Sequence, residues 1–441
     1  MCAIVNLMQF DEAVQYLLSL GHETLAMKLG LANVARLLAA LDNPQHAYPA
    51  VQIAGTNGKG STAALLAAIC RAARIRAGLY TSPHLISITE RIRLDGAQIT
   101  PAEFARWATE VRAAAESLND NGGVRPTFFE QVTALALLAF RAAGVTLALL
   151  ETGLGGRLDA TTAARAGVVA ITPIALDHQA YLGNTLAEIA AEKAAIIRAD
   201  TSVVVAPQTP PARAVINTRC RACRVTPVWA TEHVRVHDAS ADGRLRVTFE
   251  TAQAVYANVR LALRGRHQLT NAAVAIALAE MLCARGFNIP RAAIIEGLET
   301  AAHPGRLELR AGPPPVLFDG AHNPAGAEAL RAYLDEFVHA PLTLVFGAMS
   351  DKALDPVAAA LFPAARRLVL TRPTNPRAAT LDALAELAQR HAPDSLIELA
   401  APPAAAYQRA AELTPPDGLI CVTGSLYLVG EVQGLAGAPP V

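Results

Sequence analysis

Nine consecutive residues near the start of the chain have the composition of a phosphate-binding loop. They run from Ala54 to Thr62 and read Ala-Gly-Thr-Asn-Gly-Lys-Gly-Ser-Thr. Glycines let backbone amides curl around an anion, and the N-terminus of a following helix adds partial positive charge. Lys59 supplies a mobile cation, and Ser61 or Thr62 supplies a hydroxyl for a phosphate-bound Mg²⁺. The segment therefore predicts a nucleoside triphosphate site.

The loop departs from the usual phosphate-loop pattern of glycine, four residues, Gly-Lys and a hydroxyl residue. Ile53 occupies the first glycine position, and Gly60 separates the lysine from the hydroxyl. A glycine-rich turn of purely structural use is the alternative. The context favours phosphate binding, because a buried strand is predicted over Val51 to Ala54 and a helical run over Ala63 to Arg74.

Three polar side chains directly follow predicted strands in the first half of the chain. Because the carboxyl ends of parallel strands meet at one edge of a sheet, we expect these side chains to gather where ligands bind. A hydroxyl, a carboxylate and an imidazole near a phosphate loop would make a Mg²⁺ site, although histidine is a less usual ligand for that metal. Three ordinary polar strand ends are the alternative. The residues are Ser82 after the strand Gly78 to Thr81, Glu151 after Val145 to Leu150, and His178 after Val168 to Thr172.

Lys193 lies on the apolar face of a helix predicted over Asn184 to Arg198. Leu186, Ile189 and Ile197 recur at helical spacing, and Lys193 falls on the same stripe. A buried lysine is costly unless it is paired or functional. The alternative is a lysine whose stem is buried while its ammonium reaches water.

A second candidate cluster lies in the last third of the chain. The strand predicted over Val316 to Phe318 leads into a turn that holds Asp319 and His322, and Asn323 suits the N-cap of a following helix. Arg306 stands just before this strand, after a Pro-Gly break. A simple capping role for His322 is the alternative.

Aliphatic runs alternate with helical runs along the chain, which indicates α/β architecture with a doubly wound, mostly parallel sheet. Short alternating segments from about Val228 to Leu263 indicate a small antiparallel patch attached to that sheet. We place a domain boundary at the breaks His303 to Arg306 and Gly312 to Pro315, which gives domains over residues 1–300 and 301–441. The smaller C-terminal domain repeats the α/β pattern with strands predicted over Val316 to Phe318, Leu342 to Phe346, Arg367 to Leu370 and Leu419 to Thr423.

Composition excludes several classes of protein. Lys plus Arg and Asp plus Glu both number 38 in 441 residues, so the chain has no excess charge for coating nucleic acid or an anionic membrane. Hydrophobic content is 52% but aromatic content only 5%, which suits aliphatic α/β cores. The run Thr133 to Leu150 is interrupted by Arg141 and Gly144, so we expect a helix and a strand there instead of a membrane span.

The N-terminus and the cysteines predict a cytoplasmic enzyme. Met1 to Glu12 has no basic region of the kind that starts a signal peptide. Six cysteines in a chain of this length do not make a disulfide framework. Cys220 and Cys223 have redox or half-zinc spacing, but no second Cys or His pair stands nearby, so their role stays open.

Together these motifs resemble the folylpolyglutamate synthase/dihydrofolate synthase family of the Mur-ligase superfamily. The resemblance covers nearly the whole chain, and the block from Glu151 to Thr161 is its most specific part. The matching segments, in order, are Ala54–Ser61, Thr81–Leu85, Glu90–Arg93, Thr127–Glu130, Glu151–Thr161, Ala175–His178, Glu192–Lys193, His267–Gln268 with Asn271, Pro304–Arg306 and Asp319–Pro324.

The resemblance implies an ATP-dependent ligase that phosphorylates a folate or pteroate carboxylate and transfers it to the amine of L-glutamate. Lys59, His178 and a carbamylated Lys193 would be its catalytic residues, and no covalent enzyme nucleophile is required. By position, the ATP site would comprise Thr56, Asn57, Gly58, Lys59, Gly60, Ser61, Asn271, Arg306, Asp319 and His322. Mg²⁺ would be held by Ser61, Ser82, Glu151 and His178, and the pterin pocket bordered by Thr127, Phe128, Phe129, Glu130, Leu158, Asp159 and Ala160.

The resemblance further implies that the partners are ATP, L-glutamate and a folate or dihydropteroate, and we expect a monomer. Thr162, Gln179 and Ala195 depart from the family pattern, which leaves the choice between dihydropteroate and reduced folate open. A Mur-type ligase for another carboxylate acceptor is the nearest rival. The form of it that acts on a UDP-sugar peptide would usually carry an additional N-terminal domain, whereas only about fifty residues precede the loop. A P-loop switch or binding module would not need Glu151, His178 and Lys193 together.

Overall fold

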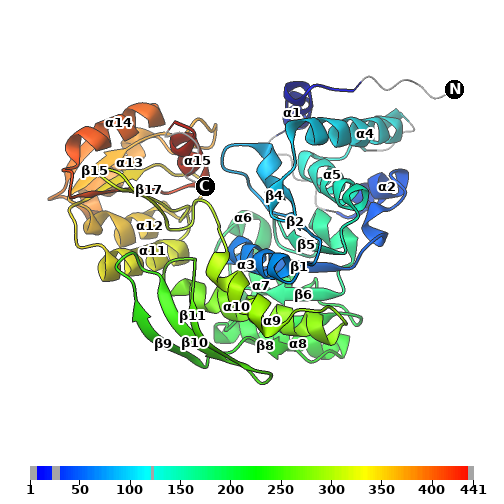
Figure 1. Cartoon of the computed structure of the whole chain (residues 1–441). Helices are drawn as coiled ribbons and strands as arrows, with labels where there is room; N and C mark the ends of the chain where they lie inside the picture. Colours follow the sequence, from blue (N-terminus) through cyan, green and yellow to red (C-terminus); the bar gives the residue numbers. More distant parts are fainter. Residues whose placement is uncertain (1–6, 22–29, 121–123, 436–441) are drawn as a thin grey trace. The chain divides into compact units, whose positions relative to one another are not determined.

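The computed structural model describes residues 7–21, 30–120 and 124–435 of the chain (Figure 1). These residues form two compact units, each of which is built from several stretches that alternate along the sequence. The first unit comprises residues up to Ile174, Leu186–Ala230 and Ala272–Gly297. The second comprises Ala175–Thr185, Thr231–Asn271 and the residues from Leu298 onwards.

The first unit is built on a mixed sheet in the order β4-β3-β2-β5-β1-β6-β7-β8. Strands β2, β5, β1, β6, β7 and β8 are parallel to one another. Strands β3 and β4 add an antiparallel edge next to β2. The strands are β1 Ala50–Ala54, β2 Ala77–Tyr80, β3 Ile92–Leu94, β4 Ala97–Gln98, β5 Leu147–Glu151, β6 Val168–Ile171, β7 Ser202–Val205 and β8 Val228–Trp229.

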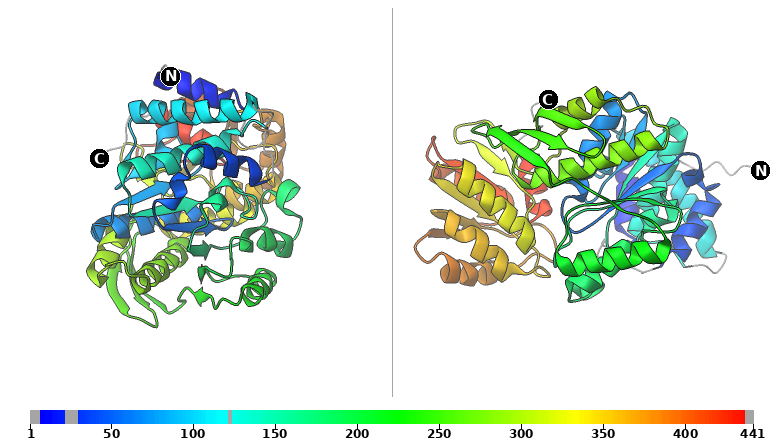
Figure 2. Two further views of the ribbon diagram at one scale, coloured as in Figure 1. Left: turned by 90° about the vertical axis from the view of Figure 1, so that its right-hand side faces the viewer. Right: turned by 90° about the horizontal axis from the view of Figure 1, so that it is seen from below.

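Helices cover both faces of this sheet, as expected for parallel strands that are buried on both sides. In Figure 2 (right) the strands lie between the yellow-green helices α9 and α10 and the green helix α8. The helices are α1 Phe10–Leu18, α2 Ala32–Ala40, α3 Lys59–Ala72, α4 Pro101–Asp120, α5 Phe128–Ala143, α7 Leu186–Ala194, α8 Pro210–Cys223, α9 His267–Ala284 and α10 Arg291–Thr300, with 3₁₀ turns η1 Pro44–His46, η2 Ile88–Arg91 and η3 Ala160–Ala164.

Strand β1 occupies the position where the order of the sheet reverses. Going along the chain, β2 lies on one side of β1, beyond β5, whereas β6 lies on the other side. All five residues of β1 are buried, and the strand pairs in parallel with both β5 and β6. Ligands of open α/β sheets bind at such a switch point, outside the carboxyl ends of the strands. The predicted phosphate loop begins at that end of β1.

The second unit contains two sheets. The larger has the order β12-β13-β17-β14-β15-β16, with β12 antiparallel to β13 and the others parallel. Figure 1 shows α11 and α12 on one face of it and α14 and α15 on the other. Its elements are β12 Glu308–Arg310, β13 Val316–Phe318, α11 Pro324–Phe337, β14 Leu342–Phe346, α12 Leu354–Leu361, η4 Phe362–Ala364, β15 Arg367–Leu370, α13 Leu381–His391, β16 Leu396–Leu399, α14 Pro403–Leu413, β17 Leu419–Thr423 and α15 Leu426–Leu435.

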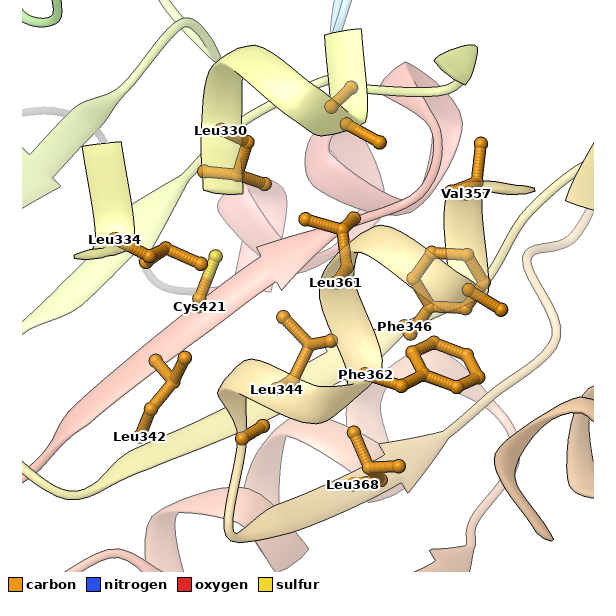
Figure 3. Packing of buried hydrophobic residues seen from close by; sticks show 14 of the residues in the cluster. Leu330, Leu334, Leu342, Leu344, Phe346, Val357, Leu361, Phe362, Leu368 and Cys421 are labelled. Carbon is orange, nitrogen blue, oxygen red and sulfur yellow. The ribbon is translucent and has the colours of Figure 1, made fainter. Parts of the chain in front are cut away.

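The core of this larger sheet follows from the alternation of its strands (Figure 3). Leu342, Leu344 and Phe346 of β14 point to one face because side chains two residues apart in a strand share a face. Leu330 of α11 and Leu361 of α12 pack onto the same cluster. Burying each such aliphatic side chain contributes roughly 2 kcal/mol.

The smaller sheet of the second unit is antiparallel, in the order β11-β10-β9, and short contacts fasten it to α11. The guanidinium of Arg266 donates to both carboxylate oxygens of Glu336, and the Tyr333 hydroxyl donates to the Asp242 carbonyl at 2.9 Å. Arg264 pairs with the Asp242 carboxylate at 2.9 Å. The strands are β9 Val234–Ala239, β10 Leu245–Glu250 and β11 Val255–Arg260, and the short helix α6 Gln179–Leu182 also belongs to this unit.

The structure confirms the predicted α/β class with a mostly parallel sheet and a second α/β region. It corrects local details. Val228 and Trp229 pair with β7 in the large sheet, and the antiparallel patch forms a sheet of its own. The helix after the phosphate loop begins at Lys59, not Ala63, and the helix that holds Lys193 covers only Leu186–Ala194. Strands β3, β4, β12 and β16 were not predicted. The division at residue 300 stays a prediction.

Among the described residues, no helix combines the length and the apolar character needed to cross a membrane.

A close helix contact yields a stability prediction. A Cβ added to Gly297 of α10 would lie 2.5 Å from the backbone N and Cα of Ile69 in α3, whereas one added to Gly434 of α15 would meet nothing within 4 Å. Gly297→Ala should therefore force the two helices apart and destabilise the chain by about 1–3 kcal/mol. Gly434→Ala is the matched control and should be neutral or slightly stabilising. Urea unfolding measures both; equal effects of the two substitutions would contradict this packing.

Candidate active site

The phosphate loop has the backbone geometry that its glycines predict. Gly58 is the N-cap of α3 in the left-handed region, and Lys59 is the first residue of that helix. The first amides of a helix have no acceptor within the helix and point toward the N-terminal end, where they can bind an anion. At Gly55 the value of φ is +151°, and a Cβ there would lie 1.9 Å from Thr172 Oγ1, so this position accepts only glycine.

Lys59 curls back over the loop. Its Nζ donates to the carbonyls of Gly55 and Thr56, each at 3.1 Å. The amides of Thr56 and Asn57 donate to the carbonyl of Pro173, at 3.0 and 3.2 Å, which ties the loop to the chain after β6. The ammonium is therefore held beside the helix N-terminus, within reach of any phosphate bound there.

Glu151 and Ser82 meet at the edge predicted for them. Glu151 is the last residue of β5, not the residue after it, and it pairs with Ile53 of β1. It is only 6% exposed, and its Oε2 accepts a hydrogen bond from the Ser82 amide at 3.2 Å. Ser61, in the first turn of α3, is also buried.

These three residues present oxygen atoms, the ligands that Mg²⁺ prefers. In the described part of the chain, no group of three or more His, Cys, Asp or Glu side chains is arranged to hold a metal. A metal here would accordingly depend on hydroxyl and phosphate oxygens in addition to one carboxylate. Such a donor set suits Mg²⁺ bound together with a nucleotide and does not suit a metal that requires several protein ligands of its own.

Lys193 is buried as its helical position predicted. It lies in the last turn of α7 with 5% of its surface exposed, among Ile189 and Ile197, which are fully buried. Its Nζ donates to the carbonyl of Gly55 at 2.8 Å. That ammonium therefore points to the phosphate loop and not to solvent.

The segment from Glu151 to Thr162 packs against the same turn of α7. A Cβ on Gly156 would lie 3.0 Å from the carbonyl oxygens of Glu192 and Lys193, and the Arg157 amide donates to the Glu192 carbonyl at 2.9 Å. Asp159 is the N-cap of η3. Burial raises the pKa of Asp159, although hydrogen bonds from Thr161 act in the opposite direction.

The structure gives two of the predicted pocket residues a capping role. Thr127 is the N-cap of α5, and its hydroxyl accepts from the Glu130 amide while Glu130 Oε2 accepts from the Thr127 amide. Phe128 is buried beneath the guanidinium of Arg91, which lies 5.4 Å from the ring centroid. Phe129 packs against Gly153 of the Glu151–Thr162 segment. Leu158 is half-buried and Ala160 is buried in the same segment.

In the second unit, the predicted nucleotide-contacting residues lie around the turn between β13 and α11. Asp319 is 7% exposed and accepts from the amides of Leu307 and Ala321, each at 2.9 Å. The Arg306 guanidinium lies against Gly320, where a Cβ would be 2.2 Å from its Nη1. His322 Nδ1 donates to the Gly320 carbonyl at 2.8 Å, since a carbonyl only accepts.

Asn323 and Asn271 both make side-chain hydrogen bonds in this unit. Asn323 is the N-cap of α11, as predicted, and its side chain accepts from the Gly326 amide at 2.9 Å. Asn271 Nδ2 donates to Gln268 Oε1 at 2.8 Å, next to His267. Burial lowers the pKa of His267, while the nearby Asp319 carboxylate raises it.

The second unit also holds a buried ion pair that sequence reasoning missed. Lys352 Nζ donates to Asp177 Oδ1 at 2.6 Å and lies 3.3 Å from His178 Nε2. Asn323 Nδ2 donates to Asp177 Oδ2 at 3.0 Å, and His322 Nε2 lies 3.5 Å from that oxygen. The sequence held a signal that Lys352 could be a site residue, because Lys352 follows strand β14 at the carboxyl edge of its sheet.

Asp177 is ionised by this surrounding. Burial alone would raise the pKa of the Asp177 carboxyl, but the hydrogen bond and charge of His322, with His178 and Lys352, hold the pKa well below its usual range. The sequence predicts His178 as a metal ligand; in the structure its ring lies beside Lys352.

Of the cysteine pair, Cys220 is held in the unreactive thiol form. Cys220 and Cys223 are free thiols on α8. Burial raises the pKa of Cys220 to about 11, which keeps it protonated near neutral pH. Cys223 Sγ donates to the Ile197 carbonyl at 3.3 Å.

Comparison with known proteins decides the family. Residues 53–279 match the Mur ligase middle domain, and residues 305–426 match the Mur ligase glutamate ligase domain. A dihydrofolate synthase/folylpolyglutamate synthase of Mycobacterium tuberculosis is 37% identical over 86% of this chain and 82% of its own. The chain belongs to the folylpolyglutamate synthase/dihydrofolate synthase family of Mur ligases.

Other members of this family agree in sequence and in fold. A probable bifunctional folylpolyglutamate synthase/dihydropteroate synthase of Haloferax volcanii is 38% identical over 97% of this chain, which spans only 50% of that protein's length. A folylpolyglutamate synthase of M. tuberculosis, solved with ADP, superposes with a TM-score of 0.91 at 32% identity, over 98% of this chain and 99% of its own.

The buried pair in the second unit predicts a pH-dependent loss of stability. Lys352→Met should lower the free energy of unfolding by about 3 kcal/mol at pH 7, because it removes one partner of a buried charge pair. Lys352 helps to lower the folded-state pKa of Asp177, so its contribution is complete above the unfolded pKa of about 4 and is lost progressively as pH falls from that value toward the much lower folded-state pKa. The difference between variant and parent should therefore shrink at pH 3.5. Denaturant unfolding at both values measures it, with Asp177→Asn and the double variant completing the cycle; additive effects would contradict the pair.

Proposed function

We propose that this chain is an ATP-dependent ligase that adds L-glutamate to a carboxylate of a folate or dihydropteroate. The observation that carries the proposal is the buried Glu151 carboxylate beside a glycine-rich phosphate loop, in a chain of this family. The balanced charge of the chain supports small-molecule partners, with no nucleic acid among them. Five free cysteines among the described residues support a reducing, cytoplasmic location, and we expect a monomer.

In the proposed reaction, a carboxylate oxygen of the acceptor attacks the γ-phosphorus of ATP and ADP leaves. The glutamate amine then attacks the carbonyl carbon of the acyl phosphate, loses a proton and displaces inorganic phosphate. Lys59 would exchange its bonds with the Gly55 and Thr56 carbonyls for bonds with phosphate oxygens, next to the first amides of α3. Both groups stabilise negative charge that develops on the transferred phosphoryl group.

Mg²⁺ would be held by Ser61, Ser82 and Glu151 of the first unit. When bound, the ion neutralises charge on the phosphate oxygens. The Ser82 amide already fixes Glu151 Oε2, so the carboxylate is oriented before any metal arrives. We retain His178 as a proposed ligand from the family resemblance.

The remaining roles are likewise proposals. Asn271, Arg306, Asp319 and His322 are proposed as nucleotide contacts on the family resemblance. The acceptor would lie along Phe129 and the segment Leu158 to Ala160. Thr127, Phe128 and Glu130 would border that pocket while also forming the start of α5.

Lys193 is proposed to be carbamylated. Its ammonium and that of Lys59 donate to the same acceptor, the Gly55 carbonyl, at 2.8 and 3.1 Å. Two ammonium groups that share one acceptor repel each other, and burial of Lys193 adds to the free-energy cost. Carbamylation would turn one of these cations into an anion, which the other cation would neutralise. The modified side chain would act as a carboxylate-like ligand at the metal site.

Turnover with defined acceptors tests the proposed function. Purified chain should release ADP and phosphate and incorporate labelled glutamate when ATP is supplied with dihydropteroate or a reduced folate. Lys59→Ala should lower the rate by at least about 10²-fold, because one preorganised contact to the phosphoryl group is lost. Arg106→Ala, an exposed cation of α4, is the control and should leave the rate unchanged.

Two outcomes would contradict the proposal. Glutamate-dependent turnover with a different carboxylate, and none with either pteridine acceptor, would favour another Mur-type ligase. A Lys59→Ala rate within about threefold of the parent would exclude the phosphate-loop assignment.

The modification of Lys193 has its own measurement. In ¹³C-bicarbonate the parent should show a carbamate carbon resonance that is missing from Lys193→Ala. That variant should fold but turn over slowly, and high concentrations of acetate or formate should restore part of the rate. A fully active enzyme without the carbamate resonance would refute the modification.

A further inference from the structure

Gln52 is a buried amide in the middle of the central strand β1. It is fully buried, as are its neighbours Val51 and Ile53. A buried amide costs free energy unless it is hydrogen-bonded, and an aliphatic residue would fill this position more cheaply. The contacts of Gln52 therefore need an explanation beyond packing.

Within the described residues, the hydrogen bonds of the Gln52 amide nitrogen all go to one segment. Nε2 lies 2.8 Å from Thr162 Oγ1, 2.9 Å from Thr161 Oγ1 and 3.3 Å from Thr152 Oγ1. These hydroxyls belong to the stretch Thr152 to Thr162, which follows the carboxylate of Glu151. A single side chain of β1 thus contacts both ends of this stretch.

The downstream contacts fix which way each hydrogen bond points. Thr161 Oγ1 donates to Asp159 Oδ1 at 2.5 Å, and Thr162 Oγ1 donates to the Gly156 carbonyl at 2.7 Å. Because both hydroxyl hydrogens are used in these bonds, the atom that Gln52 directs at them must be a donor. The amide nitrogen is that donor, and within the described residues no group donates to the opposite atom, Gln52 Oε1.

The far side of the segment rests on α7. Gly156 contacts the carbonyls of Glu192 and Lys193 so closely that a Cβ would lie 3.0 Å from each, and the Arg157 amide donates to Glu192. Asp159 Oδ2 accepts from the Leu154 amide at 2.9 Å, which closes the segment on itself. The segment is therefore fixed between β1 and α7 through two hydroxyls that Gln52 orients.

We propose that Gln52 is a positioning residue that sets the shape of the segment Thr152 to Thr162 and, through it, the acceptor side of the active site. Gln52 acts through Thr161 on Asp159 and through Thr162 on Gly156. The assignment of this segment to the acceptor rests on the proposed function; the positioning itself does not.

Hydrogen exchange tests the positioning without any substrate. In Gln52→Leu, the amides of Leu154, Arg157 and Thr161 should exchange about tenfold faster, the factor expected when one or two net hydrogen bonds are lost. Gln433→Leu removes another buried amide, which donates to Glu308 at 2.8 Å in the second unit, and should leave those three amides unchanged. Parent-like exchange of the three amides in Gln52→Leu would overturn the proposal.

Kinetics test the link to the acceptor. Gln52→Leu should raise the KM for the pteridine acceptor about tenfold and leave the KM for ATP within twofold. Thr162→Val should add little to the effect of Gln52→Leu, because both changes break one path. Equal shifts in both KM values, or an unchanged acceptor KM, would overturn the role in acceptor binding. A parent enzyme that uses no pteridine acceptor would instead refute the proposed function, and exchange would still decide the positioning.

Discussion

One backbone carbonyl, that of Gly55, organises the first unit. It accepts hydrogen bonds from Lys59 at the start of α3 and from Lys193 at the end of α7, two residues far apart in sequence. Only glycine suits this position, because its φ is +151° and a Cβ there would clash with Thr172. The strand β1, the phosphate loop and two helices consequently share one fixed point. Displacing that point would disturb the cation of the phosphate loop and the buried lysine together.

The sequence predicted well those features that depend on neighbours in the chain. The strands Val316–Phe318, Leu342–Phe346 and Leu419–Thr423 have the predicted bounds, because aliphatic runs and flanking turn residues define a buried parallel strand locally. Asn323 caps its helix for the same reason. The burial of Lys193 also followed from local periodicity, although its helix is shorter than predicted.

Features that depend on pairing across the chain could not be predicted in this way. Nothing local indicates that Lys352 lies against Asp177, or that Gln52 contacts Thr162, because more than a hundred residues separate each pair. A glutamine among aliphatic strand residues was a visible signal, but its partner was not. Conversely, Thr127 and Glu130 were interpreted as pocket residues, whereas their spacing of three is also the spacing of a capping box.

Because the stretches of the two units alternate along the sequence, neither unit is complete early in synthesis of the chain. The first unit is incomplete until Ala272–Gly297 has been made, although its β1 strand is near the N-terminus. The segment Ala175–Thr185 of the second unit is made long before the large sheet of that unit. A chain emerging from the ribosome would therefore hold one exposed aliphatic face of its first sheet, the face that α9 and α10 later cover, for about a hundred residues of translation. Long-range closure of this kind slows folding and exposes sticky surface, so this protein should depend on a chaperone or on slow elongation more than a chain whose units follow one another.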